Sequence, residues 1–326
     1  MRVIGLAVVL ALSLALTSLA VEAQQPEKVY RIGVLWPTAS KTSGWAAFVS
    51  GLQELGYVEG QNLIIDDRVF EDPVRGERLP AAAVELVRLN PDLIFAPGTE
   101  EVLRAAHRAT TTIPIVALAV DFDPIARGYV ASLRQPGGNI TGLLLNQLEL
   151  ASKRLQLLKD ALPRARRVAV FWDAVSSDQL KETEVAGRVL GLQLQRVELR
   201  NPPYDFGAAF KTAERDRAEA VLIPASPVIW GSRVRLAEVA ATSRIPVITP
   251  FGEMAAGALF TYGVNLPAMY HYAATFVGKI LKGAKPADLP VEQPTTFELV
   301  INLRTAKALG LTIPPSILLR ADQVIE

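Results

Sequence analysis

The sequence contains no cysteine among its 326 residues and only two histidines, His107 and His271. Without cysteine the chain forms no disulfide and offers no thiolate to a metal ion or to a lipid. The two histidines fall in separate predicted helices, so no histidine pair for acid–base or metal chemistry is evident. The motifs G-x-S-x-G and G-x-G-x-x-G do not occur either. These absences argue against the common classes of enzyme, and they predict a protein that needs no cofactor and no metal.

An excess of charge of either sign is also missing. The chain has 34 Lys and Arg residues against 33 Asp and Glu residues, and no basic run or stripe is present. A nucleic-acid-binding surface is therefore not expected. Beyond residue 23 no apolar run approaches the roughly 20 residues that a membrane-spanning helix needs. We therefore expect a mature chain that does not span a membrane, and we expect it to be a monomer.

The one long apolar run lies at the start of the chain, over residues 3–19, and follows a basic residue. The small residues Val21 and Ala23 then occupy the two positions that a signal peptidase reads. This pattern predicts a secretory signal peptide over 1–23, a mature chain that begins at Gln24, and a periplasmic location. The alternative is an uncleaved membrane anchor.

Short β-rich apolar runs then alternate with helical patterns, as in α/β proteins with parallel sheets. We expect strands at 29–36, 63–69, 93–96, 115–119, 141–145, 168–172, 192–197, 220–223, 247–249 and 259–262. We expect helices near 44–56, 77–89, 99–109, 150–161, 178–190, 205–216, 231–242 and 267–282. The order predicts two Rossmann-like lobes with a ligand cleft between them. The first lobe is expected over 24–146, completed by part of 265–295, and the second over 147–264, completed by part of 296–326.

Ligands of open α/β sheets bind beyond the carboxyl ends of the strands. Polar and aromatic residues alternate at these predicted ends, which suits a small amphipathic ligand. The candidate ligand-binding residues are Trp36, Thr38, Ser40, Gly98, Thr99, Asp121, Phe122, Asp173, Ser176, Ser226, Phe251 and Tyr262.

Two of these positions have structural alternatives. Thr99 is expected to cap the helix that follows, whose free amides would face an anion in the cleft. Asp121 and Asp123 form a D-x-D pair, but too few further oxygen ligands can be assembled for a metal site. Asp123 before Pro124 instead predicts a helix N-cap, which leaves Asp121 free to accept an amine.

Six stretches spread over nearly the whole mature chain carry a family resemblance: 51–62 (GLQELGYVEGQN), 111–116 (TTIPIV), 136–142 (PGGNITG), 280–291 (ILKGAKPADLPV), 298–303 (ELVINL) and 307–315 (KALGLTIPP). The chain resembles the ABC transporter substrate-binding proteins of the tryptophan/tyrosine-transport type. The resemblance implies a type I periplasmic-binding-protein-like fold whose hinge closes on a ligand. It also implies a membrane permease and a cytoplasmic ATPase as partners.

In amino-acid-binding members the matching positions place polar contacts at Thr38 and Ser40, and a threonine at a helix start at Thr99. An aspartate that binds an α-amino group is replaced here by Ser226, which carries no charge for a buried ammonium. The resemblance therefore implies that Asp121 or Asp173 takes this role, or that the ligand is not an α-amino acid.

The function expected is the periplasmic solute-binding component of an ABC importer, which binds a small amphipathic ligand by hinge closure. This ligand is expected to be amino-acid-like, aromatic or a carboxylate. One alternative is a periplasmic sensor that presents its ligand to a membrane receptor. Another is an exported enzyme on the same fold, which the missing catalytic residues disfavour.

Overall fold

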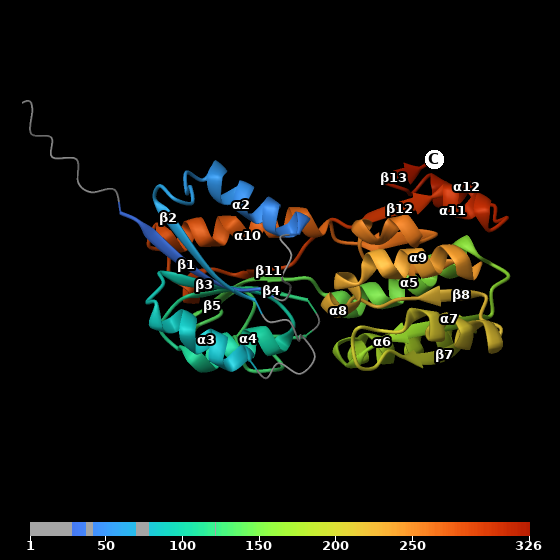
Figure 1. Ribbon diagram of the computed structural model, residues 1–326, viewed down its shortest axis with the longest axis horizontal. Coiled ribbons are helices and arrows are strands. Elements are labelled where there is room, and N and C mark those ends of the chain that lie inside the picture. Colours follow the sequence, from blue (N-terminus) through green and yellow to red (C-terminus); the bar gives the residue numbers. More distant parts are fainter. Residues whose placement is uncertain (1–27, 37–41, 70–77, 121) are drawn as a thin grey trace, which may run out of the picture.

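The computed structural model describes residues 28–36, 42–69, 78–120 and 122–326. Within this part the chain forms two β-sheets of six and seven strands, each covered by helices on both faces. Figure 1 shows the two units side by side along the long axis of the molecule. We call them the N-lobe, built on β1–β5 and β11, and the C-lobe, built on β6–β10, β12 and β13.

The N-lobe sheet has the order β11-β5-β4-β3-β1-β2, and all its strands are parallel. Its strands are β1 (Tyr30–Trp36), β2 (Leu63–Val69), β3 (Leu93–Gly98), β4 (Ile115–Ala119), β5 (Ile140–Leu144) and β11 (Val291–Glu292). One face carries α3 (Leu79–Arg88) and α4 (Glu100–Ala109), and the other carries α2 (Ser43–Glu54) and α10 (Leu266–Leu281). Phe48 of α2 stacks on Phe95 of β3 with ring centroids 4.3 Å apart.

The C-lobe sheet has the order β13-β12-β10-β9-β8-β6-β7. Its strands are β6 (Arg167–Trp172), β7 (Gln193–Glu198), β8 (Ala220–Leu222), β9 (Val247–Thr249), β10 (Phe260–Gly263), β12 (Glu298–Asn302) and β13 (Gln323–Ile325). One face is covered by α5 (Gln147–Ala161), α6 (Ser177–Val189), α11 (Leu303–Ala308) and α12 (Pro315–Leu318). The other is covered by α7 (Phe206–Arg215), α8 (Pro227–Gly231) and α9 (Arg233–Ser243).

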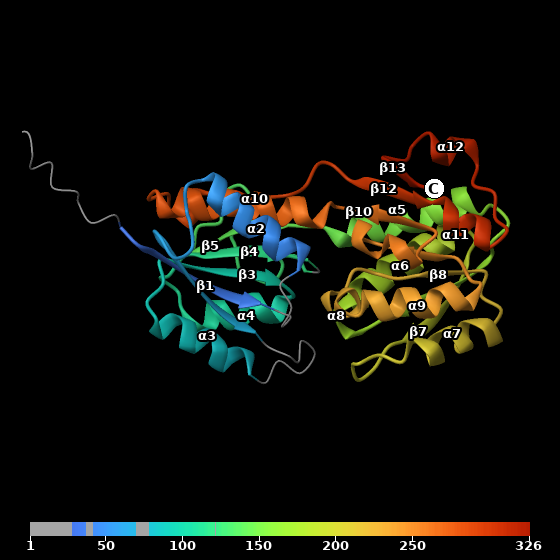
Figure 2. The same cartoon turned by 45° about the horizontal axis from the view of Figure 1, so that its top comes forward.

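Three segments of the described chain pass between the lobes, and all three are visible in the turned view of Figure 2. They follow β5 at Leu145–Asn146, follow β10 at 264–265, and link β11 to β12 at 293–297. The second crossing explains why α10, late in the sequence, packs in the N-lobe beside α2.

A buried cation ties two of these crossings together. Arg154 of α5 is 1% exposed; its Nε donates to the carbonyl oxygen of Tyr262 (2.7 Å) and its Nη2 to Oε1 of Gln147 (2.5 Å). Burial lowers the pKa of the Arg154 guanidinium to about 9, so it remains charged at neutral pH. The start of α5 and the end of β10 are thereby held at one fixed distance.

The ten strands predicted from the sequence are all present, with ends shifted by no more than two residues. The predicted type of sheet needs one correction, because β12 runs antiparallel to β10. Strands β11, β12 and β13 and helices α8, α11 and α12 were not predicted. The three helices have four to six residues, less than two turns, which is too short for a helical period to be read.

Candidate ligand-binding cleft

The strand order reverses once in each sheet, between β1 and β3 in the N-lobe and between β6 and β8 in the C-lobe. At such a point the loops beyond neighbouring strands diverge to opposite faces of the sheet and leave a crevice. Trp36 and Gly98 lie at the carboxyl ends of β1 and β3, while Asp173 and Ser226 follow β6 and β8. Both crevices lie on the side where the two lobes meet.

A cavity of about 40 Å³ lies at this meeting point. Its lining comes from both lobes: Trp36, Gly98, Val120, Leu266 and Tyr270 from the N-lobe side, and Pro227, Trp230 and Phe251 from the C-lobe. The ring centroids of Trp36 and Tyr270 are 5.3 Å apart. On the C-lobe side the Arg233 guanidinium lies over the Trp230 ring, 4.3 Å from its centroid. Four aromatic rings therefore surround a space that apolar groups line almost completely.

The volume of this cavity limits what it can hold in the described arrangement. A dry protein cavity that binds benzene has about 150 Å³, several times the volume found here. An indole or phenol ring can therefore enter only if the lobes separate or an aromatic side chain turns. The indole N–H groups of Trp36 and Trp230 are buried and have no partner in the described part of the chain. They are donors that a polar ligand atom can satisfy.

A second cavity, of about 210 Å³, lies on the hinge side of the first and shares Val120 with it. Phe122 and Asp123 line it from the N-lobe, and Asn146 and Gln147 of the first crossing line it too. The Gln147 Nε2 group is buried without a partner among the described residues. This half-polar space continues the cleft toward the pivot.

Asp173 is the centre of a buried hydrogen-bond network in the C-lobe. Its Oδ1 accepts from the backbone N–H (3.0 Å) and hydroxyl (2.8 Å) of Ser176, which forms a capping box at the turn Ala174–Ser176. Its Oδ2 accepts from the hydroxyls of Ser226 (2.5 Å) and Tyr204 (3.1 Å). Burial, together with the nearby carboxylate, raises the pKa of Tyr204. Asp173 is only 1% exposed, and its two carboxylate oxygens accept four hydrogen bonds from the protein.

Ser226 has two roles in the same network. Its side chain accepts from the backbone N–H groups of Val228 and Ile229 and so caps α8, while its hydroxyl proton goes to Asp173. The cap fixes the start of the short helix that carries Trp230 into the cavity. The Asp173 carboxylate thus positions an aromatic wall through Ser226.

Two capping predictions need correction. Thr99 is the residue before α4 and is buried, but its side chain makes no capping hydrogen bond. Asp123 accepts from the backbone N–H groups of Ile125 (2.8 Å) and Ala126 (3.2 Å), yet residues 124–128 form hydrogen-bonded turns and not a helix. The segment is too short, and Gly128 at φ 76° ends it.

The candidate residues divide into several sets. Trp36, Gly98 and Phe251 line the first cavity, and Phe122 lines the second. Asp173, Ser176 and Ser226 form the buried hydrogen-bond network of the C-lobe. Thr38, Ser40 and Asp121 lie outside the described residues. Tyr262 lies apart from both cavities and packs against the core on the α5 face of the sheet.

Sequence reasoning missed Tyr270 and Leu266, which come from α10 and not from a strand end. The return of part of 265–295 to the first lobe was expected, but no local pattern shows which residues of that segment face the cleft. Trp230, on α8 after β8, also lines the cavity and is not among the predicted residues. Its place beside Pro227 and Ser226 at a helix start was the available signal.

Glu253 of the C-lobe contacts the N-lobe. It lies in the 3₁₀ turn Gly252–Gly257 of the C-lobe, and its Oε1 accepts a long bond (3.5 Å) from the Ser43 hydroxyl at the start of α2. Burial raises the pKa of the Glu253 carboxyl. Burial also raises the pKa of Tyr270, and the nearby Glu253 charge adds to this. The Ser43–Glu253 hydrogen bond therefore links the two lobes.

A larger, more open groove of about 770 Å³ lies elsewhere in the C-lobe. Its lining includes Arg164, Glu219 and Arg244, which precede β6, β8 and β9. The groove therefore lies at the amino ends of the strands, where open α/β sheets do not bind their ligands. The aromatic cavity is therefore the better candidate for a binding site.

Within the described residues no cluster of three or more His, Cys, Asp or Glu side chains could hold a metal ion. In the same part of the chain, no helix combines the length and apolar character needed to cross a bilayer.

Two α/β lobes joined by three crossings, with an aromatic cavity where their strand orders reverse, define a two-lobed small-molecule-binding protein. The family model of the ABC transporter substrate binding proteins matches residues 39–325. The chain belongs to this family, which confirms the predicted family and the prediction that the protein is a binding protein and not an enzyme.

Individual relatives agree with this assignment. The chain is 27% identical over 274 residues to the tyrosine-binding protein of Clostridioides difficile (strain R20291), which covers 81% of this chain and 75% of the relative. It is similar to a Streptococcus pneumonia ABC domain solved in complex with L-Trp, with 25% identity, a TM-score of 0.80, and coverage of 91% of this chain and 100% of that chain. A leucine-binding protein of Thermotoga maritima shares the fold, with a TM-score of 0.56, 14% identity, and coverage of 78% and 83%. The predicted type I periplasmic-binding-protein-like fold is thereby confirmed.

Proposed function

We propose that the protein is the exported solute-binding component of an ABC importer, and that it holds a small aromatic ligand between its lobes. The observation that carries the proposal is the cavity walled by Trp36 and Tyr270 on one side and by Trp230 and Phe251 on the other. Flat rings on both lobes favour a flat ligand, because stacked and edge-to-face ring pairs add about 0.5–1.5 kcal/mol each beyond burial. The tyrosine-binding relative and the L-Trp complex support the same class of ligand.

The polar end of the ligand is proposed to be a carboxylate. The indole N–H groups of Trp36 and Trp230 are buried without a hydrogen-bond partner among the described residues. Helix α4 begins just after Gly98, which lines the cavity, and the free amides of a helix start favour an anion. An amine would need a carboxylate partner. Because Asp173 is already held by four donors, Asp121 is the residue we propose for that role if the ligand is an amino acid.

The remaining parts of the proposal rest on the sequence. Residues 1–23 are proposed as a cleaved signal peptide, which places the mature protein in the periplasm. Delivery of the ligand to a permease with its ATPase follows from membership of the family. The proposed lobes are 24–146 and 147–264, completed by parts of 265–295 and 296–326.

Calorimetry tests the ligand class. We expect L-tryptophan, L-tyrosine or 3-indolepropionate, which lacks the amine, to bind at about micromolar affinity, the equivalent of roughly 8 kcal/mol. L-Leucine should bind at least tenfold more weakly. Trp230→Ala should cost the aromatic ligand about 2 kcal/mol or more.

Trp172→Ala is the matched control, because Trp172 also ends a strand at the carboxyl edge but lines neither of the two cleft cavities. The Trp172→Ala variant should bind the aromatic ligand with the same affinity as the wild type. Equal binding of leucine and the aromatic compounds, or equal losses in the two tryptophan variants, would refute the aromatic site. Preference for 3-indolepropionate over L-tryptophan would show that the ligand carries no amine.

A further inference from the structure

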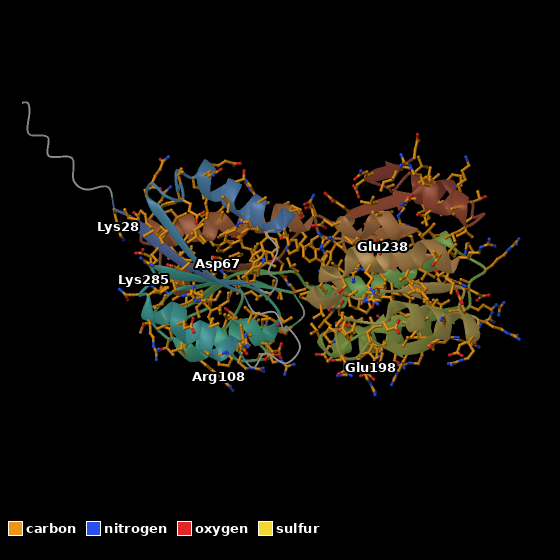
Figure 3. All side chains as sticks on the ribbon, in the orientation of Figure 1. Lys28, Asp67, Arg108, Glu198, Glu238 and Lys285 are labelled. Carbon is orange, nitrogen blue, oxygen red and sulfur yellow. The ribbon has the colours of Figure 1, made fainter. Side chains whose placement is uncertain are left out.

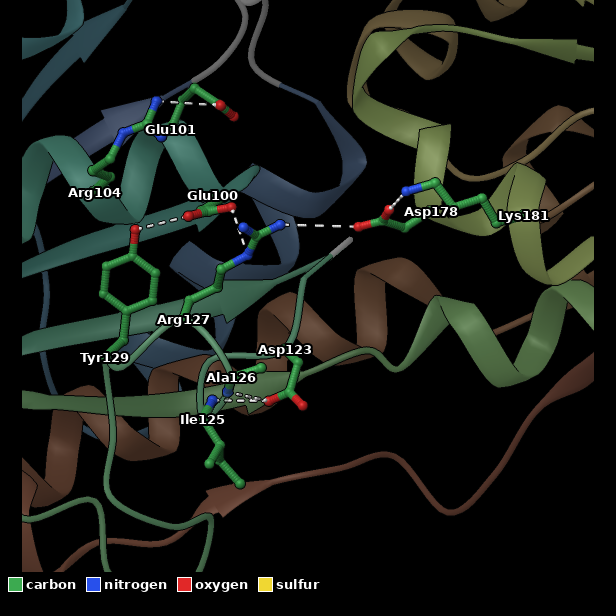
Figure 4. Close-up of polar contacts among 10 residues, drawn as sticks. All are labelled: Glu100, Glu101, Arg104, Asp123, Ile125, Ala126, Arg127, Tyr129, Asp178 and Lys181. Atoms are coloured by element: carbon green, nitrogen blue, oxygen red, sulfur yellow. Dashed lines mark hydrogen bonds and ion pairs between the residues drawn. The ribbon is translucent and has the colours of Figure 1, made fainter.

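Arg127 of the N-lobe reaches across to the C-lobe. Its Nε lies 3.3 Å from Oε2 of Glu100, at the start of α4, and its Nη2 lies 3.9 Å from Oδ2 of Asp178, in the first turn of α6. Figure 4 shows the guanidinium between the two carboxylates. One side chain thus touches an acid from each lobe.

The N-lobe holds this guanidinium firmly. Glu100 is mostly buried, with 19% of its side chain exposed, and its Oε1 accepts from the Tyr129 hydroxyl at 3.1 Å. Burial and the Glu100 charge raise the pKa of Tyr129 to about 12, so that hydroxyl stays a donor at neutral pH. The turn that carries Arg127 is fixed in turn by the two backbone bonds to Asp123. Arg127 is therefore prepositioned, and its second contact is the one that lobe separation breaks.

The C-lobe partner is more loosely held. Asp178 is 44% exposed and also binds Lys181, whose Nζ lies 2.7 Å from its Oδ1. At 3.9 Å and half exposure the Arg127–Asp178 contact is weak, and exposed pairs contribute about 0.2–1 kcal/mol. A weak contact between the lobes can break each time the lobes separate during a transport cycle.

We propose that Arg127 is a closure-positioning residue, which stabilises the closed lobes through Asp178 and slows ligand release without touching the ligand. The ligand part of this proposal rests on the proposed function; the effect on lobe closure does not. An interaction made only in the closed state shifts the open–closed equilibrium by its own free energy. The shift is therefore small, and salt should screen it.

Distance measurements between the lobes test the proposal without any ligand. Because the chain has no cysteine, Arg108→Cys and Glu238→Cys give two unique sites for spin labels, on exposed positions of different lobes (Figure 3). Double electron–electron resonance would then measure the distance between the two labels and so the fraction of molecules with closed lobes. Arg127→Ala and Asp178→Asn should each lower the closed-to-open ratio about two- to fivefold at low salt.

The double variant should lose no more than either single variant, because both remove the same contact. Arg104→Ala is the control: Arg104 pairs with Glu101 of its own helix at 3.3 Å and does not cross the cleft. In 0.5 M salt the wild type should approach the Arg127→Ala variant.

Stopped-flow release of L-tryptophan gives the second measurement, and its rate should rise by the same two- to fivefold factor. If L-tryptophan does not bind, the proposed ligand class is wrong. The distance measurement still tests whether the Arg127–Asp178 contact stabilises the closed lobes. Identical distance distributions for wild type, Arg127→Ala and Asp178→Asn at low salt would overturn the proposal. So would an equal effect of Arg104→Ala.

Discussion

At the scale of single residues, Asp173 shows how a candidate ligand contact can be a structural group. Sequence reasoning placed it correctly beyond the carboxyl end of β6, beside Ser226 beyond β8. It offered Asp173 as a free partner for an amine, whereas the carboxylate accepts four hydrogen bonds from Ser176, Ser226 and Tyr204. The positions of the strands along the chain could be predicted from apolar runs. The bonds that occupy the carboxylate could not, because Tyr204 lies in a loop whose position no local pattern indicates.

Removing this carboxylate should destabilise the C-lobe. Asp173→Ala leaves several buried donors without an acceptor, and we expect the free energy of unfolding to fall by about 2–4 kcal/mol. Asp173→Asn should cost less, about 1 kcal/mol, because its amide oxygen can still accept from Ser176. Urea unfolding followed by circular dichroism measures both values.

Asp205→Ala provides the comparison. Asp205 caps α7 by accepting from the Ala208 N–H, but the residue is exposed. Loss of an exposed cap costs about 1 kcal/mol. If Asp173→Ala destabilised the protein no more than Asp205→Ala does, Asp173 would not be the buried anchor that we describe.

At the scale of elements, the packing of α2 against α10 builds one wall of the cleft. Glycines allow the close approach: a Cβ at Gly44 would lie 2.5 Å from Cδ2 of Tyr270, and one at Gly51 would lie 2.8 Å from the carbonyl oxygen of His271. The helical period of residues 44–56 and 267–282 predicted both helices. Their pairing was not predicted, because the two segments lie more than 200 residues apart and meet only after the second crossing.

Alanine substitutions at these two glycines should affect different properties, ligand affinity at Gly44 and stability at Gly51. Gly44→Ala should displace the Tyr270 ring, which lines the cavity, and weaken aromatic ligand binding about tenfold, or roughly 1.4 kcal/mol. Gly51→Ala crowds the same helix pair away from the cavity. It should lower the free energy of unfolding by about 1–3 kcal/mol and leave the affinity unchanged. Calorimetry and urea unfolding of both variants decide this, and equal affinity losses would show that Tyr270 does not shape the site.

At the scale of the whole molecule, the protein is two sheets whose carboxyl edges face one another across three crossings. The alternation of strands and helices was sufficient to predict two lobes and a cleft, because that pattern is set by local burial along the chain. The completion of the first lobe by part of 265–295 was expected, whereas the final strands and the pairing of α10 with α2 were not, since no local pattern shows which elements meet. A continuous cluster of apolar side chains now runs from Trp36 across to Trp230 and Phe251. Ligand binding and lobe closure are therefore expected to be one event.

The most direct test is a crystal structure of the protein with the aromatic compound that binds most tightly in calorimetry. We predict that its ring lies between Trp36 and Tyr270 of one side and Trp230 and Phe251 of the other, with contacts to both lobes. The volume of the cavity in this complex should exceed the 40 Å³ found here. A ligand bound in the groove at Arg164 and Arg244, or touching one lobe alone, would contradict the account.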